Sequence, residues 1–594
     1  DLASFQKQAS SQVLTSSACY EAFSSMGIEY GEGHRGIQEL YVGAGLVLAR
    51  LSLPSTLSAS ASRYVLHPSL MDSALQATVG FLLGARGDLS PNPILPFVLQ
   101  KLEVYQACAS EMWAVLRHSE GSQAGGAVEK LDIDLCDEAG RVSVRIKGFT
   151  YRALDAKTPS GQEGKNDPLV GKLTLAPVWD VVTPERVPSF PASADRVLVV
   201  GGTSEQQRSV RLHLSNVQSL DLQPSDSIAE IGDKLQRLGS FDHIFWIAPE
   251  RALSSVTNEA LVREQEEGVL LLFRTVKALL QAGYESRPLG WTVLTTQAQP
   301  LHAQEQVNPT HASLHGLVGS LAKEYPRWKI RLVDLEAGAW PLVDLLQLPS
   351  DRRGRSWVYR GGEWHRQQLV LLQAAPADGT LYRQGGVYVV IGGAGRIGEA
   401  WTEYMIRRYE AQVVWIGRRQ PDASIRAKLE ALGRHGKAPH YVAADATDAA
   451  SLQRARYEIK QRYGRIDGII HSAMVLQDAG LDRMEEAQFR TGFSAKADVS
   501  LRVAQVFRDE PLDFVLFFSS IISFIKNANQ SHYAAGCTFM DAFAHQMARE
   551  MSCRVKVMNW GYWNAEEIVH SKEGELLSQV GIGFVEPKEA MEAL

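Results

Sequence analysis

The sequence lacks several features that would assign it to a large class of proteins. Its formal net charge is −6 over 594 residues, so there is no electrostatic reason to expect a nucleic acid or an anionic membrane as a partner. Long hydrophobic runs are also missing, because the longest apolar stretch, residues 268–273, is soon followed by Arg274 and Lys277. A membrane span needs roughly 20 consecutive apolar residues, and no signal-peptide pattern opens the chain. The sequence therefore predicts a protein with neither of these partners.

Cysteine is scarce and follows no pairing pattern. The five cysteines are odd in number, widely separated and without CxxC spacing: Cys19, Cys108, Cys136, Cys537 and Cys553. Disulfides belong to oxidising compartments, and metal-binding cysteines usually lie close together in sequence. This usage predicts reduced thiols and a cytoplasmic location.

The chain is long enough for several domains. At roughly 150 residues per domain, its 594 residues predict three or four units, and 45% apolar with 22% charged residues is typical of a soluble protein. Residues 154–168 are rich in Pro, Gly and charge without an apolar period, which predicts a linker, and residues 373–379 predict a second boundary. Because the sequence starts and stops abruptly, we expect it to be a piece of a longer polypeptide.

The segments between these boundaries differ in their secondary-structure pattern. Residues 1–153 contain several β-like runs with short turns and one helix-like stretch after His67, which predicts an α+β unit. Residues 169–372 and 380–594 each alternate apolar strands with longer helical stretches, as in a parallel sheet with helical crossovers. The expected fold class is therefore α/β, with two similar units in tandem after a smaller α+β unit.

A glycine-rich loop follows the first expected strand of the last segment. The strand VYVVI runs into GGAGRIG at residues 392–398 and then into a stretch with helical spacing. Glycines allow a tight turn there and bring backbone N–H groups close to a pyrophosphate at the positive end of a helix. Taken alone, such a loop could equally be a tight turn. The corresponding loop of the middle segment, residues 201–209, lacks the third glycine and is predicted to bind no nucleotide.

The residues after the second strand of the last segment indicate which dinucleotide would bind. About 20 residues after the loop, where an acidic residue would bind a ribose 2′-OH, the sequence has Arg418 and Arg419. Guanidinium groups suit a 2′-phosphate, which favours NADPH over NADH. A solvated basic turn is the alternative, but this is the position that the motif specifies.

Residues 168–594 resemble a ketoreductase of a modular polyketide synthase, a relative of the short-chain dehydrogenases/reductases. Besides the glycine loop and GRR, the matching pieces are DATD (445–448), IIHSA (469–473), LFFSSI (516–521), HYAAG (532–536) and NWGYW (559–563). The resemblance implies two Rossmann-like subdomains, a structural half without cofactor at 169–372 and a catalytic half at 380–594. The sequences around the glycine loop and HYAAG are most similar to synthases whose acyltransferase acts in trans.

The resemblance also implies the ligands. The substrate would be a 3-oxoacyl chain on a phosphopantetheinylated acyl carrier protein, with other domains of the same synthase as partners. A catalytically silent, reductase-like scaffold is the alternative. NADPH would be bound by Gly392, Gly393, Gly395, Ile397, Gly398, Arg418, Arg419, Asp445, Ala446, Ser472 and Ala473.

Three further residues would carry the chemistry. Reduction of a ketone develops an alkoxide that must be protonated, and a phenol with a pKa of about 10 donates poorly at neutral pH unless a nearby cation lowers that pKa. In the family this cation is a lysine upstream of the serine, not one turn after the tyrosine. The resemblance implies Tyr533 as the general acid, Ser520 as the donor that orients the carbonyl and Lys496 as the cation.

Each of these residues also has an ordinary structural interpretation. Ser520 could cap a turn, Tyr533 could be an interface aromatic and Lys496 could lie on the surface. Their joint spacing with the glycine loop favours the catalytic interpretation. One departure leaves a role open: four residues after the tyrosine, where the family usually has an active-site asparagine, this sequence has Cys537.

A further motif bears on stereochemistry. In the family, an aspartate in a Leu-x-Asp motif accompanies the D-configured (B-type) alcohol, and a tryptophan shortly before the catalytic tyrosine accompanies the opposite choice. Here Leu476 and Asp478 complete the first motif, and Ile525 stands where that tryptophan would be. The resemblance therefore implies a D-3-hydroxyacyl product, with Asp478 as the stereocontrolling residue.

Residues 1–153 resemble the second half of a polyketide synthase dehydratase, which has a double hot-dog fold. The matching pieces are GIEYGEGHRGI (27–37), HPSLMDSALQ (67–76) and LPFVLQKLEVY (95–105). In the family, the aspartate of the second motif, here Asp72, works with a histidine of the first hot dog.

The partner histidine of that motif is missing. No His-x-x-x-Gly-x-x-x-x-Pro motif precedes Asp72, and neither His34 nor His67 matches it. We therefore expect that this chain does not dehydrate its own product and that residues 1–153 serve as a docking or folding partner. A first half supplied by another chain is the alternative.

One histidine pair has a spacing that could hold a metal. His311 and His315 lie one helical turn apart, but the sequence shows no third ligand. A structural helix face is the ordinary interpretation, and we expect no metal site.

Overall fold

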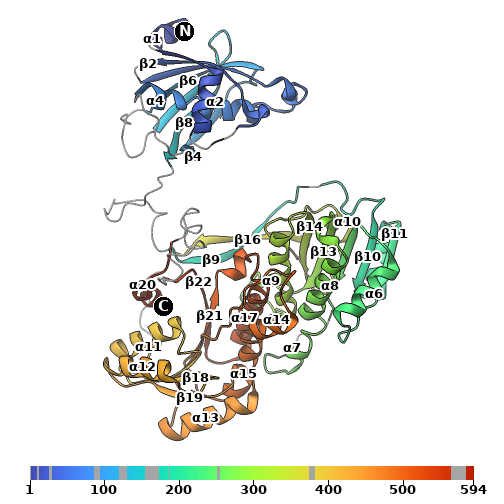
Figure 1. Cartoon of the computed structure of the whole chain (residues 1–594), viewed down its shortest axis with the longest axis vertical. Coiled ribbons are helices and arrows are strands. Elements are labelled where there is room, and N and C mark those ends of the chain that lie inside the picture. The colour runs from blue at the N-terminus through green and yellow to red at the C-terminus, as the bar shows by residue number, and fades with distance from the viewer. Residues whose placement is uncertain are drawn as a thin grey trace. The chain divides into compact units, whose positions relative to one another are not determined.

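The computed structural model divides the chain into two compact units, Asp1–Asp167 and Pro168–Leu594, which are traced in Figure 1. The predicted linker at 154–168 and the predicted boundary at 373–379 lie outside the described residues, as does part of the 27–37 motif. The structure describes residues 2–9, 12–25, 28, 30–43, 45–85, 94–119, 130–153, 173–185, 187–250, 255–372, 382–563 and 583–594.

The first unit is an antiparallel sheet packed against helices. Its strands are β1 (Gln12–Thr15), β2 (Ile37–Gly43), β3 (Leu46–Ser52), β4 (Ile94–Val98), β5 (Lys101–Val104), β6 (Glu111–His118), β7 (Lys130–Cys136) and β8 (Val142–Ala153). They lie in the order β1-β2-β3-β6-β7-β8-β4, with β5 also paired to β8. The helices are α1 (Leu2–Gln8), α2 (Ser16–Ser25), α3 (Pro68–Gln76) and α4 (Val79–Ala85). Side chains of α2 and α3 share one core with the sheet, as in a hot-dog unit.

The sequence predicted one helix-like stretch after His67, where α3 and α4 lie, and missed α1 and α2. Cys19 and Phe23 of α2 are buried against the sheet. The helix is rich in serine, a weak helix former, so tertiary packing stabilises a segment whose own propensity does not indicate a helix.

The structural half of the second unit is built on an eight-stranded sheet. Its strands are β9 (Leu175–Val181), β10 (Arg196–Gly201), β11 (Asn216–Leu220), β12 (His243–Ile247), β13 (Leu289–Thr296), β14 (Trp328–Leu335), β15 (Ser356–Arg360) and β16 (Glu363–Leu371). The order is β11-β10-β12-β13-β14-β15-β16-β9, parallel from β11 to β15 and antiparallel beyond. The helices are α5 (Ser204–His213), α6 (Ile228–Leu238), α7 (Ala260–Arg263), α8 (Val269–Gln281), α9 (Pro309–Glu324) and α10 (Leu342–Leu346).

The catalytic half is a six-stranded, fully parallel sheet. Its strands are β17 (Val387–Ile391), β18 (Gln412–Gly417), β19 (His440–Ala443), β20 (Gly468–His471), β21 (Phe514–Ser520) and β22 (Arg554–Trp560). The helices are α11 (Arg396–Tyr409), α12 (Ala423–Gly433), α13 (Ala449–Tyr463), α14 (Glu486–Ser494), α15 (Ala497–Phe507), α16 (Ile522–Ile525), α17 (Ser531–Glu550) and α20 (Pro587–Ala593). The order in space is β19-β18-β17-β20-β21-β22. Successive strands therefore add to one side of β17 up to β19 and to its other side from β20 onward, which makes the point between β17 and β20 a topological switch point. Open α/β sheets bind ligands at the carboxyl ends of strands at such a switch point.

The two halves share one hydrophobic core rather than meeting at a thin interface. Buried side chains of α8 and α9 belong to the same cluster as those of α15 and α17, and Figure 1 shows α9 beside α17. At this contact a Cβ added to Gly316 would lie 2.3 Å from the backbone of Ala534. Only glycine allows the two helices to approach so closely.

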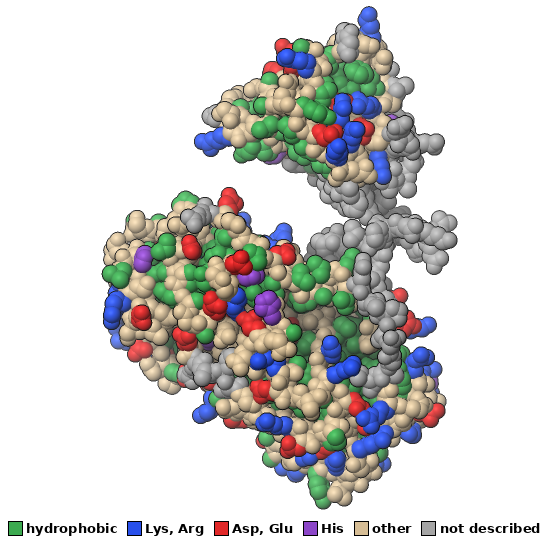
Figure 2. Space-filling model, turned by 180° about the vertical axis from the view of Figure 1, so that it is seen from behind, with side chains coloured by type: hydrophobic (Ala, Val, Ile, Leu, Met, Phe, Trp, Pro, Cys, Tyr) green, Lys and Arg blue, Asp and Glu red, His purple; other side chains and the backbone are tan. Residues whose placement is uncertain are grey.

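The surface is mixed in charge. In the view of Figure 2, basic and acidic side chains are interspersed over the second unit and do not gather into a patch of one sign. Within the described residues, no helix is both long enough and apolar enough to cross a membrane.

Candidate active site

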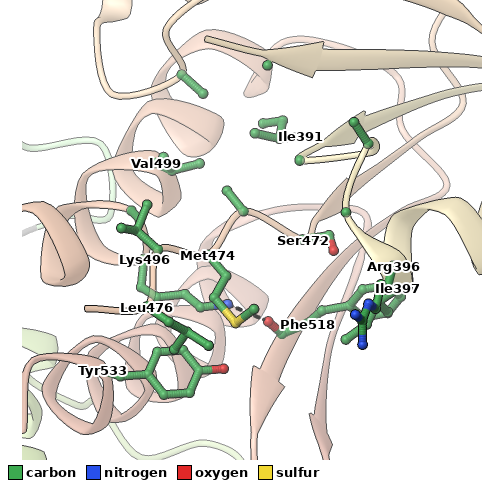
Figure 3. A pocket seen from close by; sticks show the side chains of 18 of the residues that line it. Ile391, Arg396, Ile397, Ser472, Met474, Leu476, Lys496, Val499, Phe518 and Tyr533 are labelled. Atoms are coloured by element: carbon green, nitrogen blue, oxygen red, sulfur yellow. Dashed lines mark hydrogen bonds between the residues drawn. The ribbon is translucent and has the colours of Figure 1, made fainter. Parts of the chain in front are cut away.

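A cavity of about 760 Å³ lies at the switch point of the catalytic sheet. Residues of the glycine loop and the ends of β18 and β20 line one part of it, and residues of β21, α17 and the segment after β22 line another. In Figure 3, Arg396 and Ile397 lie on one side of this space, while Lys496 and Tyr533 lie on the other. Its size is within the range of small-molecule and cofactor sites.

The glycine loop has the close approaches that require glycine. Gly392 has φ +84°, and a Cβ there would lie 2.8 Å from the backbone of Ala473. A Cβ at Gly393 would lie 2.1 Å from Cδ1 of Trp415, and one at Gly398 would lie 2.7 Å from Cα of Gly393. Gly393 and Gly398 are therefore needed for packing behind the loop and do not line the cavity.

The N-terminus of α11 opens onto the cavity. Gly395 is its N-cap residue, in an extended conformation, and no described side chain caps the helix. Gly395 and Ile397 line the cavity. The first N–H groups of a helix need partners and carry the positive end of its dipole, so they suit an anion. Loop and helix end together fit the pyrophosphate of a dinucleotide.

The two arginines after β18 both line the cavity, but they differ in their partners. Nη1 of Arg419 lies 3.1 Å from Oδ2 of Asp422. Arg418 forms no ion pair with any residue in the described ranges. Its guanidinium is therefore the cation of this turn that can neutralise a ligand phosphate.

The remaining residues that the sequence assigned to the cofactor also line the cavity. They are Asp445, Ala446, Ser472 and Ala473. The Asp445 carboxylate accepts hydrogen bonds from the backbone N–H (2.9 Å) and hydroxyl (2.7 Å) of Thr447, so its side chain fixes its own turn. The sequence did not identify Met474 or Gln530, which line the cavity as well, because they belong to none of the motifs that the sequence displays.

Ser520 and Tyr533 meet in the cavity, as predicted, although they come from different elements. Ser520 is the last residue of β21, and Tyr533 lies in the first turn of α17. Both line the cavity; burial raises the pKa of the phenol, and hydrogen bonding with Ser520 offsets part of that rise. The Ser520 hydroxyl oxygen also accepts the N–H of Ile522 at 3.2 Å, which leaves its hydrogen available to donate.

Lys496 is fully buried, and its contacts differ from the predicted ones. Nζ donates to the carbonyl oxygen of Phe518 at 2.7 Å, shown as the dashed line in Figure 3, and lies 5.9 Å from the centroid of the Tyr533 ring. The sequence argument expected this cation to lower the pKa of Tyr533. Burial instead raises that pKa well above its ordinary value, and Cys537 adds to the rise. The expected lowering is wrong, because desolvation outweighs the attraction of a cation at this distance.

Cys537, which stands where the family usually has an asparagine, lies on a buried face of α17. Tyr533, Cys537 and Asp541 follow one another at intervals of four residues and so lie on the same face. Burial raises the pKa of Cys537 to about 11 and also raises the pKa of Asp541. A neutral thiol therefore occupies the position of the family's amide.

Asp541 takes part in holding the end of β21, a role that the sequence did not predict. Its Oδ2 accepts from Nδ2 of Asn559 at 2.8 Å, and the same Nδ2 lies 3.2 Å from the carbonyl oxygen of Ser520. With Lys496 on Phe518, a buried and a half-buried side chain thus fix two carbonyls at the end of this strand. The NWGYW motif could have indicated Asn559, but only the fold places Asp541 beside it.

Asp478, the predicted stereocontrolling residue, lies at the rim of the cavity. Its Oδ2 accepts from Nε2 of Gln530 at 2.7 Å, which ties it to the segment just before Tyr533. Leu476, two residues earlier, is 50% exposed beside it. This loop can therefore contact a substrate that enters the cavity.

In the first unit, Asp72 is hydrogen-bonded to His34, a histidine that does not match the motif of the family's base. Oδ2 of Asp72 lies 2.9 Å from Nδ1 of His34 and accepts from Nε2 of Gln76 at 2.8 Å. His67 instead caps α3 through the N–H of Ser69. The 27–37 motif and α3 are brought together by the fold, and sequence spacing does not show this contact.

His311 and His315 are buried and engaged within the protein. The two nitrogens of His311 lie 2.9 Å and 3.0 Å from the carbonyl oxygens of Thr296 and Pro249. Nε2 of His315 lies 2.8 Å from Oγ1 of Thr295. Over the described ranges, no group of three or more His, Cys, Asp or Glu side chains could hold a metal ion.

Comparison with known protein families gives two matches. Residues 386–565 match the KR domain, and residues 3–161 match the polyketide synthase dehydratase N-terminal domain. Since this description names the N-terminal domain, the assignment of residues 1–153 to the second half of a dehydratase stays a prediction from motifs.

Two curated relatives match along the whole chain. Polyketide synthase PksM of Bacillus subtilis (strain 168) is 48% identical over 599 residues, which are 100% of this chain and 14% of PksM. PksN of the same organism is 45% identical over 601 residues, 100% of this chain and 11% of PksN. The chain thus spans a small part of the length of either relative.

Solved structures are similar in fold. An N-terminal ketoreductase from the macrolactin assembly line has a TM-score of 0.59 at 20% identity, covering 71% of this chain and 89% of that one. A ketoreductase domain from the bacillaene assembly line has a TM-score of 0.54 at 21% identity, covering 71% and 93%.

Proposed function

This chain belongs to the polyketide synthases, with a dehydratase-family domain followed by a KR domain, and from this premise we propose that its KR domain reduces a 3-oxoacyl thioester to the 3-hydroxyacyl thioester with NADPH. The acyl chain would be carried by the phosphopantetheine arm of an acyl carrier protein. One observation carries the proposal: the glycine loop, which leads into a helix without a side-chain N-cap, lines the same cavity as Ser520 and Tyr533.

The cofactor residues support NADPH in particular. The glycine loop and the start of α11 would hold the pyrophosphate, and Arg418 would neutralise the 2′-phosphate. Bound there, NADPH would supply the hydride for the reduction.

The remaining steps belong to the chain's own side chains. Ser520 would donate its hydroxyl hydrogen to the substrate carbonyl, and Tyr533 would give its phenolic proton to the developing alkoxide. Lys496 and Asn559 would keep β21 in register by binding the carbonyls of Phe518 and Ser520. Burial raises the pKa of Tyr533 well above its ordinary value, so the phenol carries its proton at neutral pH and would release it only to a base as strong as the developing alkoxide.

The alternative is a silent scaffold, and a simple assay separates the two. Purified full chain is incubated with NADPH and a simple 3-oxoacyl thioester, and loss of NADPH is followed together with the mass of the product. Reduction is expected to add two hydrogens to the thioester. Absence of turnover by the folded protein, with NADPH binding intact, would favour the scaffold.

For the stereochemistry we propose the D-3-hydroxyacyl product. Asp478 at the rim of the cavity, tied to Gln530, supports this assignment through the Leu-x-Asp motif. Chiral chromatography of the product tests it, and mainly L product would overturn it.

For the first unit we propose that no dehydration follows. Elimination of water needs a base and an acid on opposite sides of the substrate, whereas His34 and Asp72 bond directly to each other at 2.9 Å. A 3-hydroxyacyl thioester incubated with the chain should keep its mass. An enoyl product abolished by Asp72→Asn would contradict this.

A further inference from the structure

Two loops of the catalytic half flank the entrance to the cavity. The first, here called the Asp478 loop, is residues 476–482, and the second, the Asn529 loop, is residues 525–530. They are bonded to each other, since the N–H of Ala479 donates to the carbonyl of Asn529 at 3.0 Å and Gln530 donates to Asp478. Helix α17, which carries Tyr533 in its first turn, follows the Asn529 loop directly, so the spacing of the loops sets the distance from Asp478 to the phenol.

A single carboxylate of the structural half holds both loops. Glu324, the last residue of α9, accepts the N–H of Leu481 through Oε2 at 2.8 Å. It accepts the N–H of Asn529 through Oε1 at 2.9 Å. Asn529 has φ +65°, a left-handed conformation that asparagine tolerates better than most residues. Each oxygen of one side chain thus fixes one loop.

Neighbouring side chains reinforce the same junction. Lys323 donates to the carbonyl of Ile525. Nζ of Lys526 donates to the carbonyl of Gly354 at 2.9 Å, and a Cβ at Gly319 would lie 2.0 Å from Cδ of Lys526. The Asn529 loop is therefore anchored in the structural half through both backbone and side chain.

The Asp478 loop has its own second anchor. Nζ of Lys277, in α8, donates to the carbonyls of Leu481 at 3.0 Å and Asp482 at 2.7 Å. Lys277 touches only this loop, and Lys323 touches only the other. Of these three side chains of the structural half, only Glu324 bonds to both loops.

We infer that Glu324 is a positioning residue that fixes the spacing between the Asp478 loop and the start of α17, and thereby the face of the ketone presented for reduction. The inference rests on the proposed reductase function and deepens it, because it assigns stereochemical control partly to the half without cofactor. Glu324 acts through the two loops and does not line the cavity.

The energy at stake is of the right size. A tenfold change in product ratio corresponds to about 1.4 kcal/mol. A hydrogen bond to a charged acceptor contributes on that order. Loss of one of the two bonds of Glu324 is thus enough to move the ratio measurably.

The test compares Glu324→Gln and Glu324→Asp with the wild-type full chain. The amide of glutamine keeps one acceptor oxygen and loses the other, and aspartate keeps both but is one methylene shorter. Glu324→Gln is expected to move the ratio of D to L product about tenfold toward the minor enantiomer. Glu324→Asp is expected to move it less, whereas a merely structural role would change stability and leave the ratio as it is.

The matched control is Glu550→Gln at the other end of α17. Glu550 also links the halves through two bonds, from the hydroxyl of Ser255 at 2.6 Å and the N–H of Val256 at 3.1 Å, but it touches neither loop. Its substitution should leave the product ratio unchanged. An equal shift in Glu550→Gln, or an unchanged ratio in active Glu324→Gln, would overturn the inference.

A second measurement does not depend on turnover. Amide hydrogen exchange at Leu481 and Asn529 should be at least tenfold faster in Glu324→Gln than in the wild type, with exchange in β21 unchanged. If the wild type reduces no thioester, the proposed function fails. The exchange measurement still tests whether Glu324 holds the Asp478 loop and the Asn529 loop together. Unchanged exchange at both amides would overturn it.

Discussion

The structural and catalytic halves both place a parallel strand before a first helix, β10 before α5 and β17 before α11, and they differ at the start of that helix. In the structural half, Oγ1 of Thr203 accepts the N–H of Gln206 at 3.2 Å, and the Gln206 side chain accepts the N–H of Thr203 at 2.8 Å. This capping box satisfies the start of α5 with the protein's own groups. In the catalytic half, Gly395 stands at the same place without a side chain. The fold alone does not make a nucleotide site; a helix start left for a ligand does.

The second strand of each half shows the same contrast. β11 is followed by Asp221, whereas β18 is followed by Arg418. The carboxylate of Asp221 would repel a phosphate, whereas the guanidinium of Arg418 would attract it. The structural half has instead kept residues that bond to the other half, Glu324 among them. In the proposed function, the catalytic half would bind the cofactor and the structural half would position the loops beside it.

Removing the phenol tests whether the chemistry resides in the catalytic half alone. Tyr533→Phe should lower kcat about 10²- to 10⁴-fold, the usual contribution of a general acid. The dissociation constant for NADPH should stay unchanged, because in the proposed function the glycine loop and Arg418 would hold the cofactor. Steady-state kinetics and a binding titration measure both, and an unchanged kcat would refute the role of Tyr533.

A side-chain cap at the start of α11, like the one at the start of α5, should remove the difference between the two helix N-termini. In Gly395→Ser, the hydroxyl would bond to the N–H groups at the start of α11. NADPH should then bind about 10- to 100-fold more weakly, while the melting temperature stays equal or rises slightly. The control is Gly395→Ala, which adds the same Cβ 3.2 Å from the carbonyl of Gly392 but no cap. Equal loss in both variants would assign the effect to crowding.

Replacing the base after β18 sharpens the second contrast. Arg418→Ala should raise KM for NADPH about tenfold and change KM for NADH little, because only NADPH carries the 2′-phosphate. Arg419→Ala serves as a comparison, since Arg419 already pairs with Asp422 and should have a smaller effect. A parallel rise in both KM values would place the role of Arg418 elsewhere.

The smallest expected effect concerns stability where the halves meet. Burial raises the pKa of Asp498 from 3.8 to about 6, and Glu259 of the structural half adds to the rise. A raised carboxyl pKa favours the protonated folded state, so this contribution is complete below pH 3.8 and lost as pH rises through 6. Asp498→Asn should therefore be more stable than the wild type at pH 8, by about 1 to 3 kcal/mol, with the difference vanishing near pH 4.

Denaturant unfolding at several pH values measures this difference. Asp509→Asn, at an exposed position of the same region, is the matched control and should change little at any pH. A wild type more stable than Asp498→Asn at pH 8 would contradict the prediction.

Local pattern predicted the parts of the fold that are local. The apolar strands of both halves, the glycine loop and the Ser520–Tyr533 pair follow from runs and spacings that a sequence displays directly. Glu324, which bonds to Leu481 and Asn529 far along the chain, has no such signal, because it is defined by the packing of two helices. The contact between His34 and Asp72 escaped for the same reason.

The sequence also did not predict the pKa shift of Tyr533. The residues around Tyr533 were identified correctly as neighbours in the cavity, but the direction of its pKa shift was wrong. Sequence shows which charges are present and not how much water surrounds them. The balance between desolvation and attraction depends on burial, which is a property of the folded chain.

The close contact of α9 with α17 has a consequence for the exchange of domains between synthases. Gly316 meets the backbone of Ala534, next to Tyr533, so the helix that carries the proposed general acid packs on a surface supplied from more than 200 residues earlier in the sequence. A transplanted catalytic half would meet a foreign surface at this point. Recombination junctions that preserve activity should therefore lie before β9 and after α20, with both halves inherited together.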